Sequence, residues 1–437
     1  RSLGSALGPL SAGRARARMT PDFRASLSRW HAAAIAAVQG TRVFKDFARV
    51  EGDVLIFERG DRRIRFSLPQ RGGRLRIVGL GKAALGMARG VRAVLQAAKR
   101  EVDDGLLIVR DRPLAINERE PWEIVIGNHP YPGEDSERAA RRLLEFIGEP
   151  RAEDRFVVLL SGGASALCAL PAPGVTLEDK RRATQALMNS GASIAEINGL
   201  RQQLSAIKGG RLAAHFAPAD FVTFAISDVP DDDPLVIGSA PTWSETLANR
   251  GASYGVIATL DDALEAAALV ARADGFDVVS LGRSLNGSVE QETTRIITAL
   301  EQRLNDRSHD RPCVLIAGGE PLVRVKGPGR GGRAQELALR LGRALSASAI
   351  CGVSGPITGL VAGTDGSDGP TDAAGAFFDG TVVARADARH LDLDRLLETN
   401  DSGSALEALG DLRVTGPTGT NVADVLMVVI PGPRNLA

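Results

Sequence analysis

Short apolar runs alternate with longer amphipathic stretches through most of the chain. Continuous apolar runs bounded by turn residues are typical of buried parallel strands, whereas apolar residues that recur every three or four positions predict helices. In the first half this pattern predicts strands over 74–79, 105–109, 122–127, 156–160 and 221–226, with helices over 82–99, 134–147, 177–190 and 193–207. Such alternation predicts a Rossmann-like, doubly wound α/β domain.

Two further elements are expected ahead of this alternation. Residues 22–40 predict a helix that ends at Gly40, because glycine commonly terminates helices. Residues 52–58 and 62–68 predict a short hairpin with a turn at Gly60.

A turn-rich segment near 241–253 interrupts the alternation, which then resumes. We expect strands over 254–258, 277–281, 313–317, 322–326, near 357–362 and over 425–430, and helices over 260–273, 288–304 and 333–345, with short helices near 381–409. A chain of 437 residues exceeds one typical core. We therefore predict a larger domain over 19–245 and a smaller α/β domain over 246–437.

Composition excludes several classes of protein. Hydrophobic residues make up 44% and charged residues 24%, which is ordinary for a globular protein, and the net charge of zero argues against a nonspecific nucleic-acid binder. No apolar run approaches the length of a membrane span. The cysteines (Cys168, Cys313, Cys351) fit no metal spacing, so we expect buried thiols in a reduced, cytoplasmic protein.

The first 18 residues are rich in Arg, Ser, Ala and Gly and contain no acid. They have the composition of a transit peptide, and they also fit an upstream remnant that precedes a start at Met19. We expect a disordered leader that takes no part in the fold.

The most informative motif is the glycine-rich run over 327–332, which opens the helix predicted from Arg333. Glycine permits close backbone approach to a ligand, and a helix N-terminus favours anions. We therefore expect Gly331 and Gly332 to bind phosphate, with Arg330 and Arg333 as bidentate donors. A flexible loop with solvated arginines is the alternative.

A second motif, Gly79-Leu-Gly81-Lys82-Ala-Ala84, follows a predicted strand and opens a helix. It matches a dinucleotide fingerprint, with Glu101 and Asp103 near the expected place of the ribose-binding acid. The lysine inside the motif suits a triphosphate better, as a point charge on the transferred group. A surface lysine on a tight turn is the alternative.

A third loop, Ser161-Gly162-Gly163-Ala-Ser165, follows the strand 156–160. Its backbone N–H groups and two hydroxyls would hold an anion. The order of residues is not that of a nucleophile elbow, and the chain contains no Walker A motif.

Arg201, Ser205 and Lys208 are spaced three to four residues apart, so they predict one polar helix face directed to the cleft, or else a solvated face. Thr418 lies in a Gly/Thr loop that would bind phosphate or merely close the domain.

Acidic residues follow two of the predicted strands. Asp228 lies where α/β proteins bind ligands, and it would hold Mg²⁺ or take a proton from a substrate hydroxyl. Asp365 and Asp368 lie in a glycine-rich loop and are candidate Mg²⁺ ligands, because Mg²⁺ prefers one or two carboxylates plus phosphate oxygens. Asx-turns without any ligand are the alternative for this loop.

Together these motifs resemble the glycerate kinase family of the MOFRL type. The matching stretches are GLGKAALGMA (79–88), NHPYPGEDS (128–136), LSGGASAL (160–167), INGLRQQLSAIKGGRLA (197–213), ISDVPDDDPLVIGSAPT (226–242), GGEPLVRVKGPGRGGRAQELAL (318–339), AGTDGSDGPTDAAGA (362–376) and TGPTGTNVADVL (415–426). The resemblance implies two α/β domains with the active site between them, and phosphorylation of D-glycerate, commonly at its 2-hydroxyl, by ATP with a divalent metal. It places the family's active-site lysine and arginine on Lys82 and Arg333.

We accordingly expect ATP and D-glycerate as ligands with Mg²⁺ as cofactor, and the sequence leaves a homodimer open. Lys82 would stabilise the transferred phosphoryl group, Arg333 would hold the same group or the glycerate carboxylate, and Asp228 would polarise the acceptor hydroxyl. The remaining expected contacts are Gly81, Ser161, Gly162, Gly163, Ser165, Gly331, Gly332, Lys208 and Thr418 for nucleotide phosphates, Arg201, Ser205 and Glu320 for substrate, and Asp365 and Asp368 for metal. The rival hypotheses are an NAD(P)H-dependent hydroxypyruvate reductase and a non-catalytic binding protein.

Overall fold

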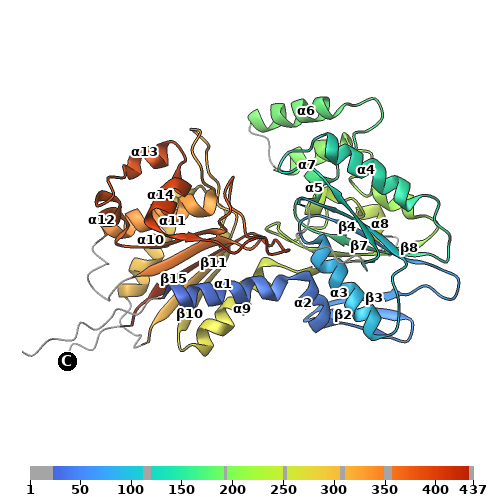
Figure 1. Cartoon of the computed structure of the whole chain (residues 1–437), viewed down its shortest axis with the longest axis horizontal. Coiled ribbons are helices and arrows are strands. Elements are labelled where there is room, and N and C mark those ends of the chain that lie inside the picture. Colours follow the sequence, from blue (N-terminus) through green and yellow to red (C-terminus); the bar gives the residue numbers. More distant parts are fainter. Residues whose placement is uncertain are drawn as a thin grey trace, which may run out of the picture.

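The computed structural model describes residues 23–111, 120–190, 194–249, 253–305, 311–348 and 357–432. The expected leader, Met19 and Cys351 lie outside these residues. Two α/β parts lie side by side, each built around a six-stranded sheet (Figure 1). In the described part of the chain, no helix is long and apolar enough to cross a bilayer.

The first sheet is entirely parallel and has the strand order β6–β5–β4–β7–β8–β9. The strands are β4 (Leu75–Leu80), β5 (Asp104–Val109), β6 (Trp122–Ile126), β7 (Arg155–Leu160), β8 (Asp220–Ile226) and β9 (Ser253–Ala258). This is the Rossmann order: successive strands are added outward on one side of β4 and then, from β7 on, outward on its other side. The predicted doubly wound fold is therefore confirmed.

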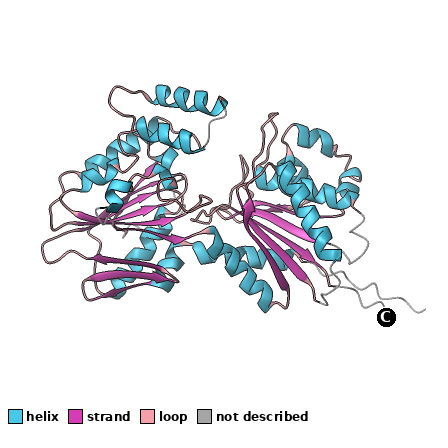
Figure 2. Cartoon of the chain, turned by 180° about the vertical axis from the view of Figure 1, so that it is seen from behind, coloured by secondary structure: helices cyan, strands magenta, loops and turns pink. Residues whose placement is uncertain are grey.

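Alternate residues of the central strands pack on opposite faces of this sheet, as a pleated strand requires. Leu75 and Ile77 of β4 belong to one apolar cluster, and Val78 and Leu80 belong to another. Helices cover both faces (Figure 2). They are α3 (Ala84–Ala97), α4 (Glu134–Ile147), α5 (Ala164–Leu167), α6 (Leu177–Asn189), α7 (Ile194–Gln203) and α8 (Glu245–Asn249), with the 3₁₀ turns η1 (Arg211–Phe216) and η2 (Ile237–Ser239).

The second sheet is mixed, with the order β10–β11–β15–β12–β13–β14, and only β10 and β11 are parallel. Its strands are β10 (Asp277–Leu285), β11 (Cys313–Gly319), β12 (Thr358–Gly363), β13 (Gly375–Asp379), β14 (Leu412–Arg413) and β15 (Asp424–Ile430). Its helices are α9 (Leu260–Ala273), α10 (Val289–Asn305), α11 (Arg333–Ala347), α12 (Val382–Asp387), α13 (Leu393–Glu398) and α14 (Ser402–Leu409).

One prediction for this second part was wrong, and the strands β13 and β14 were not predicted. The expected strand over 322–326 is absent: within the segment only Leu322 forms a bridge, to Ser288, and Val325 is 78% exposed. β13 was missed, because the sequence pattern did not distinguish this glycine-bounded strand from the loop before it.

The strand 254–258 was expected to open the second domain, but it is β9 and pairs in parallel with β8 of the first sheet. Its residue Gly255 lies against Ile64 of the small antiparallel sheet β1 (Ala48–Glu51), β2 (Val54–Arg59) and β3 (Arg62–Ser67). The predicted hairpin is thus confirmed as β2 and β3, and β1 adds a third strand. The chain passes to the second sheet only after residue 258.

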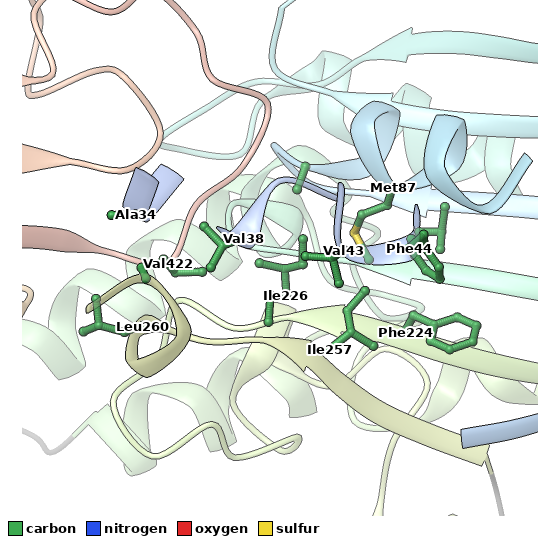
Figure 3. Packing of buried hydrophobic residues seen from close by; sticks show 14 of the residues in the cluster. Ala34, Val38, Val43, Phe44, Met87, Phe224, Ile226, Ile257, Leu260 and Val422 are labelled. Carbon is green, nitrogen blue, oxygen red and sulfur yellow. The ribbon is translucent and has the colours of Figure 1, made fainter. Parts of the chain in front are cut away.

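The first helix crosses in the opposite direction. α1 (Arg24–Val38) packs against α9 and β12 of the second part, whereas α2 (Gly40–Phe47) packs against α3 of the first part. Gln39 therefore separates the two helices, and Gly40, which was expected to end the first helix, instead begins α2 and lies so close to Met87 that a Cβ atom would overlap it. Figure 3 shows the apolar residues that bridge the two parts, from Ala34 and Val38 across Val422 and Leu260 to Phe224.

Replacement of Trp30 by alanine should destabilise the protein by about 3–5 kcal/mol, as for other buried large-to-small changes. The Trp30 ring is fully buried and meets Phe276 edge-on at 5.0 Å. Both Trp30 and the exposed Arg29 donate hydrogen bonds to Asp274. Arg29→Ala is therefore the matched control, with an expected cost of about 0–1 kcal/mol. Chemical unfolding monitors both variants, and equal effects would show that α1 contributes no packing to the second part.

Candidate active site

The loops that follow β4 and β7 are joined at the point where the strand order reverses. Ser161 N–H donates to Leu80 O, Lys82 N–H donates to Gly162 O, and Ala83 N–H donates to Ser161 Oγ, each at 3.0 Å. Gly81 has φ +117°, and a Cβ atom there would lie 2.4 Å from Ser161 Oγ. The second glycine of the motif therefore permits close contact between two loops, rather than with a ligand.

This arrangement contradicts two expectations for the Gly79–Ala84 motif. Gly81 N–H donates to Ile108 O, so with Lys82 and Ala83 the loop directs three backbone donors at protein atoms. Asp103 precedes β5, and its carboxylate accepts from Leu75 N–H at 2.7 Å at the amino end of the sheet. A ribose-binding acid belongs at the carboxyl end of the strand, so neither the pyrophosphate site nor the acid of a dinucleotide fold is present here.

The Ser161 loop has backbone N–H groups that could donate hydrogen bonds to an anion. Within the described residues, no partner is recorded for the backbone N–H groups of Gly162 and Gly163. Lys82 lies beside this loop, because a Cβ atom on Gly163 would be 3.4 Å from Lys82 Cγ.

Lys82 connects the two parts of the protein. Its Nζ is 2.7 Å from Asp365 Oδ2, in the loop that follows β12, and both side chains are largely buried. Burial alone would raise the pKa of Asp365, but Lys82 holds it below its usual range. The Asp365 carboxylate therefore stays ionised at neutral pH.

Arg333 is the first residue of α11 and forms a second set of ion pairs. Its Nε donates to Asp424 Oδ2 at 2.6 Å, and its Nη2 donates to Glu320 Oε1 at 2.8 Å. A Cβ atom on Gly363 would contact Asp424 Oδ1 at 3.1 Å and Asp365 Oδ1 at 3.3 Å. The partners of Lys82 and Arg333 thus flank one glycine, so the two cations serve the same site.

Asp228 follows β8 and lies at the centre of these charges. Its Oδ2 accepts from Asn421 Nδ2 at 3.0 Å, and a Cβ atom on Gly162 would lie 1.9 Å from the same oxygen. Burial and Glu320 raise the pKa of Asp228 to about 6, although Lys82 and Arg333 act to lower it. Asp228 therefore bears a charge at neutral pH and readily accepts a proton.

Sequence reasoning missed several residues of the site. His129 lies beside Gly163, and burial, Lys82 and Arg110 lower its pKa to about 4, so the imidazole is neutral at pH 7. Asn421 and Asp424 come from the segment before and at the start of β15. All three occur in stretches that carried the family resemblance, and this was the one signal that pointed to them.

Other predicted contacts have internal partners instead. Asp368 Oδ1 and Oδ2 accept from Ala334 and Gln335 N–H at 3.2 and 2.8 Å, so this carboxylate caps α11. Burial and Asp424 raise the pKa of Asp368 to about 7. The cap occupies the helix N-terminus at which Gly331 and Gly332 were expected to hold phosphate, and a Cβ atom on Gly332 would overlap the Asp368 carboxylate.

The predicted polar face of Arg201, Ser205 and Lys208 is also different. α7 ends at Gln203, so the three residues do not share a helix. Ser205 is buried, and its hydroxyl donates to Leu170 O at 3.1 Å, which makes it a structural residue. Arg201 and Lys208 both line a cavity of about 1010 Å³ together with Gly163, Ser165 and His129.

A smaller cavity of about 440 Å³ lies between the two parts. Lys82 and Asp365 line it, as do Arg110 and the loop that contains Thr418. The Thr418 hydroxyl, which was expected to bind phosphate, donates to Thr364 O at 2.6 Å and so joins this loop to the end of β12. Gly163 lines the larger cavity and Lys82 lines the smaller one, and a Cβ atom on Gly163 would lie 3.4 Å from Lys82 Cγ, so the linings of the two cavities are adjacent.

Comparison with known proteins gives two family matches. Residues 26–267 match the Domain of unknown function (DUF4147), and residues 313–424 match the MOFRL family. D-glycerate 2-kinase of Thermotoga maritima is 36% identical over 85% of this chain and 94% of its own length. Glycerate 2-kinase of Pyrococcus horikoshii is 30% identical over 92% and 96%, respectively. A protein of Agrobacterium vitis, named provisionally as a hydroxypyruvate reductase, is 37% identical over 83% and 89%.

Solved structures agree with these relatives. The crystal structure of glycerate kinase from Thermotoga maritima superposes with a TM-score of 0.74 at 32% identity, covering 93% of this chain and 99% of that one. A crystal structure of a Pyrococcus horikoshii protein gives 0.69 at 29% identity, covering 95% and 100%.

Proposed function

Because the chain belongs to the glycerate kinase family of the MOFRL type, we propose that it transfers the γ-phosphoryl group of ATP to D-glycerate. One observation carries the proposal: Lys82 and Asp228, at the carboxyl ends of β4 and β8, lie close enough to Arg333, at the start of α11, for their charges to act on one another. Phosphoryl transfer depends mainly on such alignment and charge stabilisation.

Each of the three residues has a role in this reaction. The acceptor hydroxyl oxygen forms a bond to the γ-phosphorus, the bond from phosphorus to the β–γ bridging oxygen breaks, and ADP leaves. Asp228 takes the hydroxyl proton. Lys82 stabilises the charge on the transferred group, and Arg333, which Asp424 holds in place, binds the glycerate carboxylate in exchange for Glu320.

The acidic residues fit a divalent metal only in a limited way. In the described residues, no three His, Cys, Asp or Glu side chains gather as a metal site. Mg²⁺ commonly uses one or two carboxylates and takes its other ligands from phosphate and water. We propose that Asp365 rather than Asp368 holds it, since both Asp368 oxygens accept helix N–H groups. When bound, Mg²⁺ would neutralise charge on the nucleotide phosphates.

We propose the 2-hydroxyl as acceptor, because the relatives from Thermotoga maritima and Pyrococcus horikoshii are named as 2-kinases. The reductase name of the Agrobacterium vitis relative supplies the second candidate function. The geometry disfavours it, because the backbone donors that would hold a dinucleotide pyrophosphate bond to Ile108, Ser161 and Gly162.

Incubation of the protein with ATP, Mg²⁺ and D-glycerate should yield 2-phosphoglycerate, identified by ³¹P NMR through the position of the new phosphate ester. A parallel mixture of NADH or NADPH with hydroxypyruvate should show no change of absorbance at 340 nm. Direct oxidation of the cofactor without coupling enzymes would favour the reductase, and a 3-phosphate ester would contradict the assigned acceptor.

Replacement of Lys82 by alanine should reduce kcat by about 10³-fold, by analogy with the loss of other charge stabilisers. Lys82→Arg keeps the charge and should recover part of the activity. The exposed Lys45 of α2 supplies the matched control, and Lys45→Ala should keep normal turnover. A coupled assay of ADP release measures all three, and near-normal turnover in Lys82→Ala would remove this residue from the mechanism.

The value of kcat/KM should fall as the pH drops through about 6, because the protonated Asp228 carboxyl can no longer accept the hydroxyl proton. The expected slope below that pH is about tenfold per unit. Asp368, whose pKa is about 7, titrates in the same range, so Asp368→Asn is the control and should keep the limb near pH 6. If the fall of kcat/KM below pH 6 disappeared in Asp368→Asn, the titrating group would be the Asp368 cap of α11 and not Asp228.

A further inference from the structure

The larger cavity is lined by many cations that have no role in the phosphoryl transfer described above. It lies in the first part, between α6, α7, the Ser161 loop and the segment 129–132, and its volume is about 1010 Å³. α6 stands away from the rest of this part (Figure 1). Cations dominate the lining: Lys180, Arg181, Arg182, Arg201 and Lys208, against one acid, Glu178.

Two of these cations, Lys180 and Lys208, are buried and a third, Arg201, is half-buried, and none of them has a recorded acidic partner among the described residues. Lys180 is 4% exposed, and its Nζ has no hydrogen-bond partner among the described residues. Lys208 is 3% exposed, and within the described ranges its Nζ donates to the neutral Ser165 alone, to the carbonyl at 2.7 Å and to the hydroxyl at 2.6 Å. No ion pair of the half-buried Arg201 is recorded in the described part of the chain.

Burial of several unpaired cations is unfavourable, because each loses its hydration and repels the others. The pKa values reflect this cost. Burial and Arg201 lower the pKa of Lys180 to about 8, and burial and Lys180 lower that of Lys208 well below its usual value. A polyanion bound among them would relieve both effects. The single acid, Glu178, is exposed and pairs with Arg181 at 3.8 Å, so it does not neutralise the interior.

We propose that this cavity binds the nucleotide, with its phosphate chain on Lys180, Arg201 and Lys208 and its terminal phosphate directed to Lys82. The proposal rests on the proposed function. Gly163 and His129 line the cavity and adjoin Lys82, so the cavity opens toward the site of transfer. Glycerate bears one charge on three carbons, and it would leave most of this charge and volume unmatched.

The aromatic ring for the base comes from the segment 129–132. Tyr131 lines the cavity and is 76% exposed, and such high exposure is unusual for a large aromatic side chain. Purines commonly stack on such rings. Tyr131 therefore interacts with the base, and the buried cations interact with the phosphates.

Calorimetric titrations with ADP, a non-hydrolysable ATP analogue and inorganic tripolyphosphate test the assignment. Lys180→Met and Arg201→Met should each raise the Kd of all three ligands by at least about tenfold, as expected for a charge-assisted contact. Tyr131→Ala should weaken binding of the two nucleotides and leave tripolyphosphate unchanged. The control is Arg141→Met on α4, an exposed arginine outside the cavity that pairs with Glu137, and it should change nothing.

Thermal unfolding of the ligand-free protein gives a second readout. Lys180→Met removes an uncompensated buried charge, so the free variant should unfold at a higher temperature than the wild type but gain less from added ADP. A merely structural Lys180 would give the opposite result for the free protein.

Two outcomes would overturn the assignment: unchanged nucleotide binding in both cation variants, or a rise confined to the KM for glycerate. Failure of the proposed function has a separate signature, since the wild type would then bind nucleotide without phosphorylating glycerate.

Discussion

The ion pair between Lys82 and Asp365 is the contact on which the site depends. It joins the loop after β4 of the first sheet to the loop after β12 of the second, at a point where both partners are largely shielded from water. Neither part of the protein contains a complete site, because the parallel sheet provides Lys82 and Asp228 while the mixed sheet provides Arg333, Asp365 and Asp424. This ion pair thus adds to the apolar contacts between the two parts, and a bound phosphate would compete with Asp365 for Lys82.

The surrounding charges follow a simple order. Lys82 pairs with Asp365, Arg333 pairs with Asp424, and Gly363 lies between the two acids. Asp228 has an amide partner in Asn421 and no recorded ion pair in the described part of the chain, and burial and Glu320 raise the pKa of its carboxyl to about 6. The absence of a side chain at Gly162 is what lets Asp228 approach the Ser161 loop.

Much of the fold could be predicted from the sequence, because continuous apolar runs between amphipathic helices leave little alternative to a parallel sheet. The strand that pairs with each edge strand could not be predicted. The sequence of β9, for example, has the same apolar pattern whether the strand extends the first sheet or opens the second. In the candidate site, Lys82 and Asp228 were predicted from charge next to strand ends, and Arg333 was predicted from the glycine-rich run that opens α11. Asp368 and Ser205 were misassigned because a polar group in a loop has the same sequence signature whether it meets a ligand, caps α11 or bonds to Leu170. His129 and Asn421 owe their roles to neighbours far away in the sequence, so local patterns gave no warning of them.

The crossing of α1 has a consequence for biosynthesis. This helix is translated before the strands of both six-stranded sheets, yet its apolar face, with Leu27, Trp30 and Ala34, is buried against elements that begin after residue 258. Domains usually fold in the order in which they emerge. Here α1 must wait, with its apolar face uncovered, until the last half of the chain has been translated. A fragment that ended near residue 258 would therefore contain α1 without the elements that cover its apolar face, so the chain could not be expressed as two independent halves divided at that point.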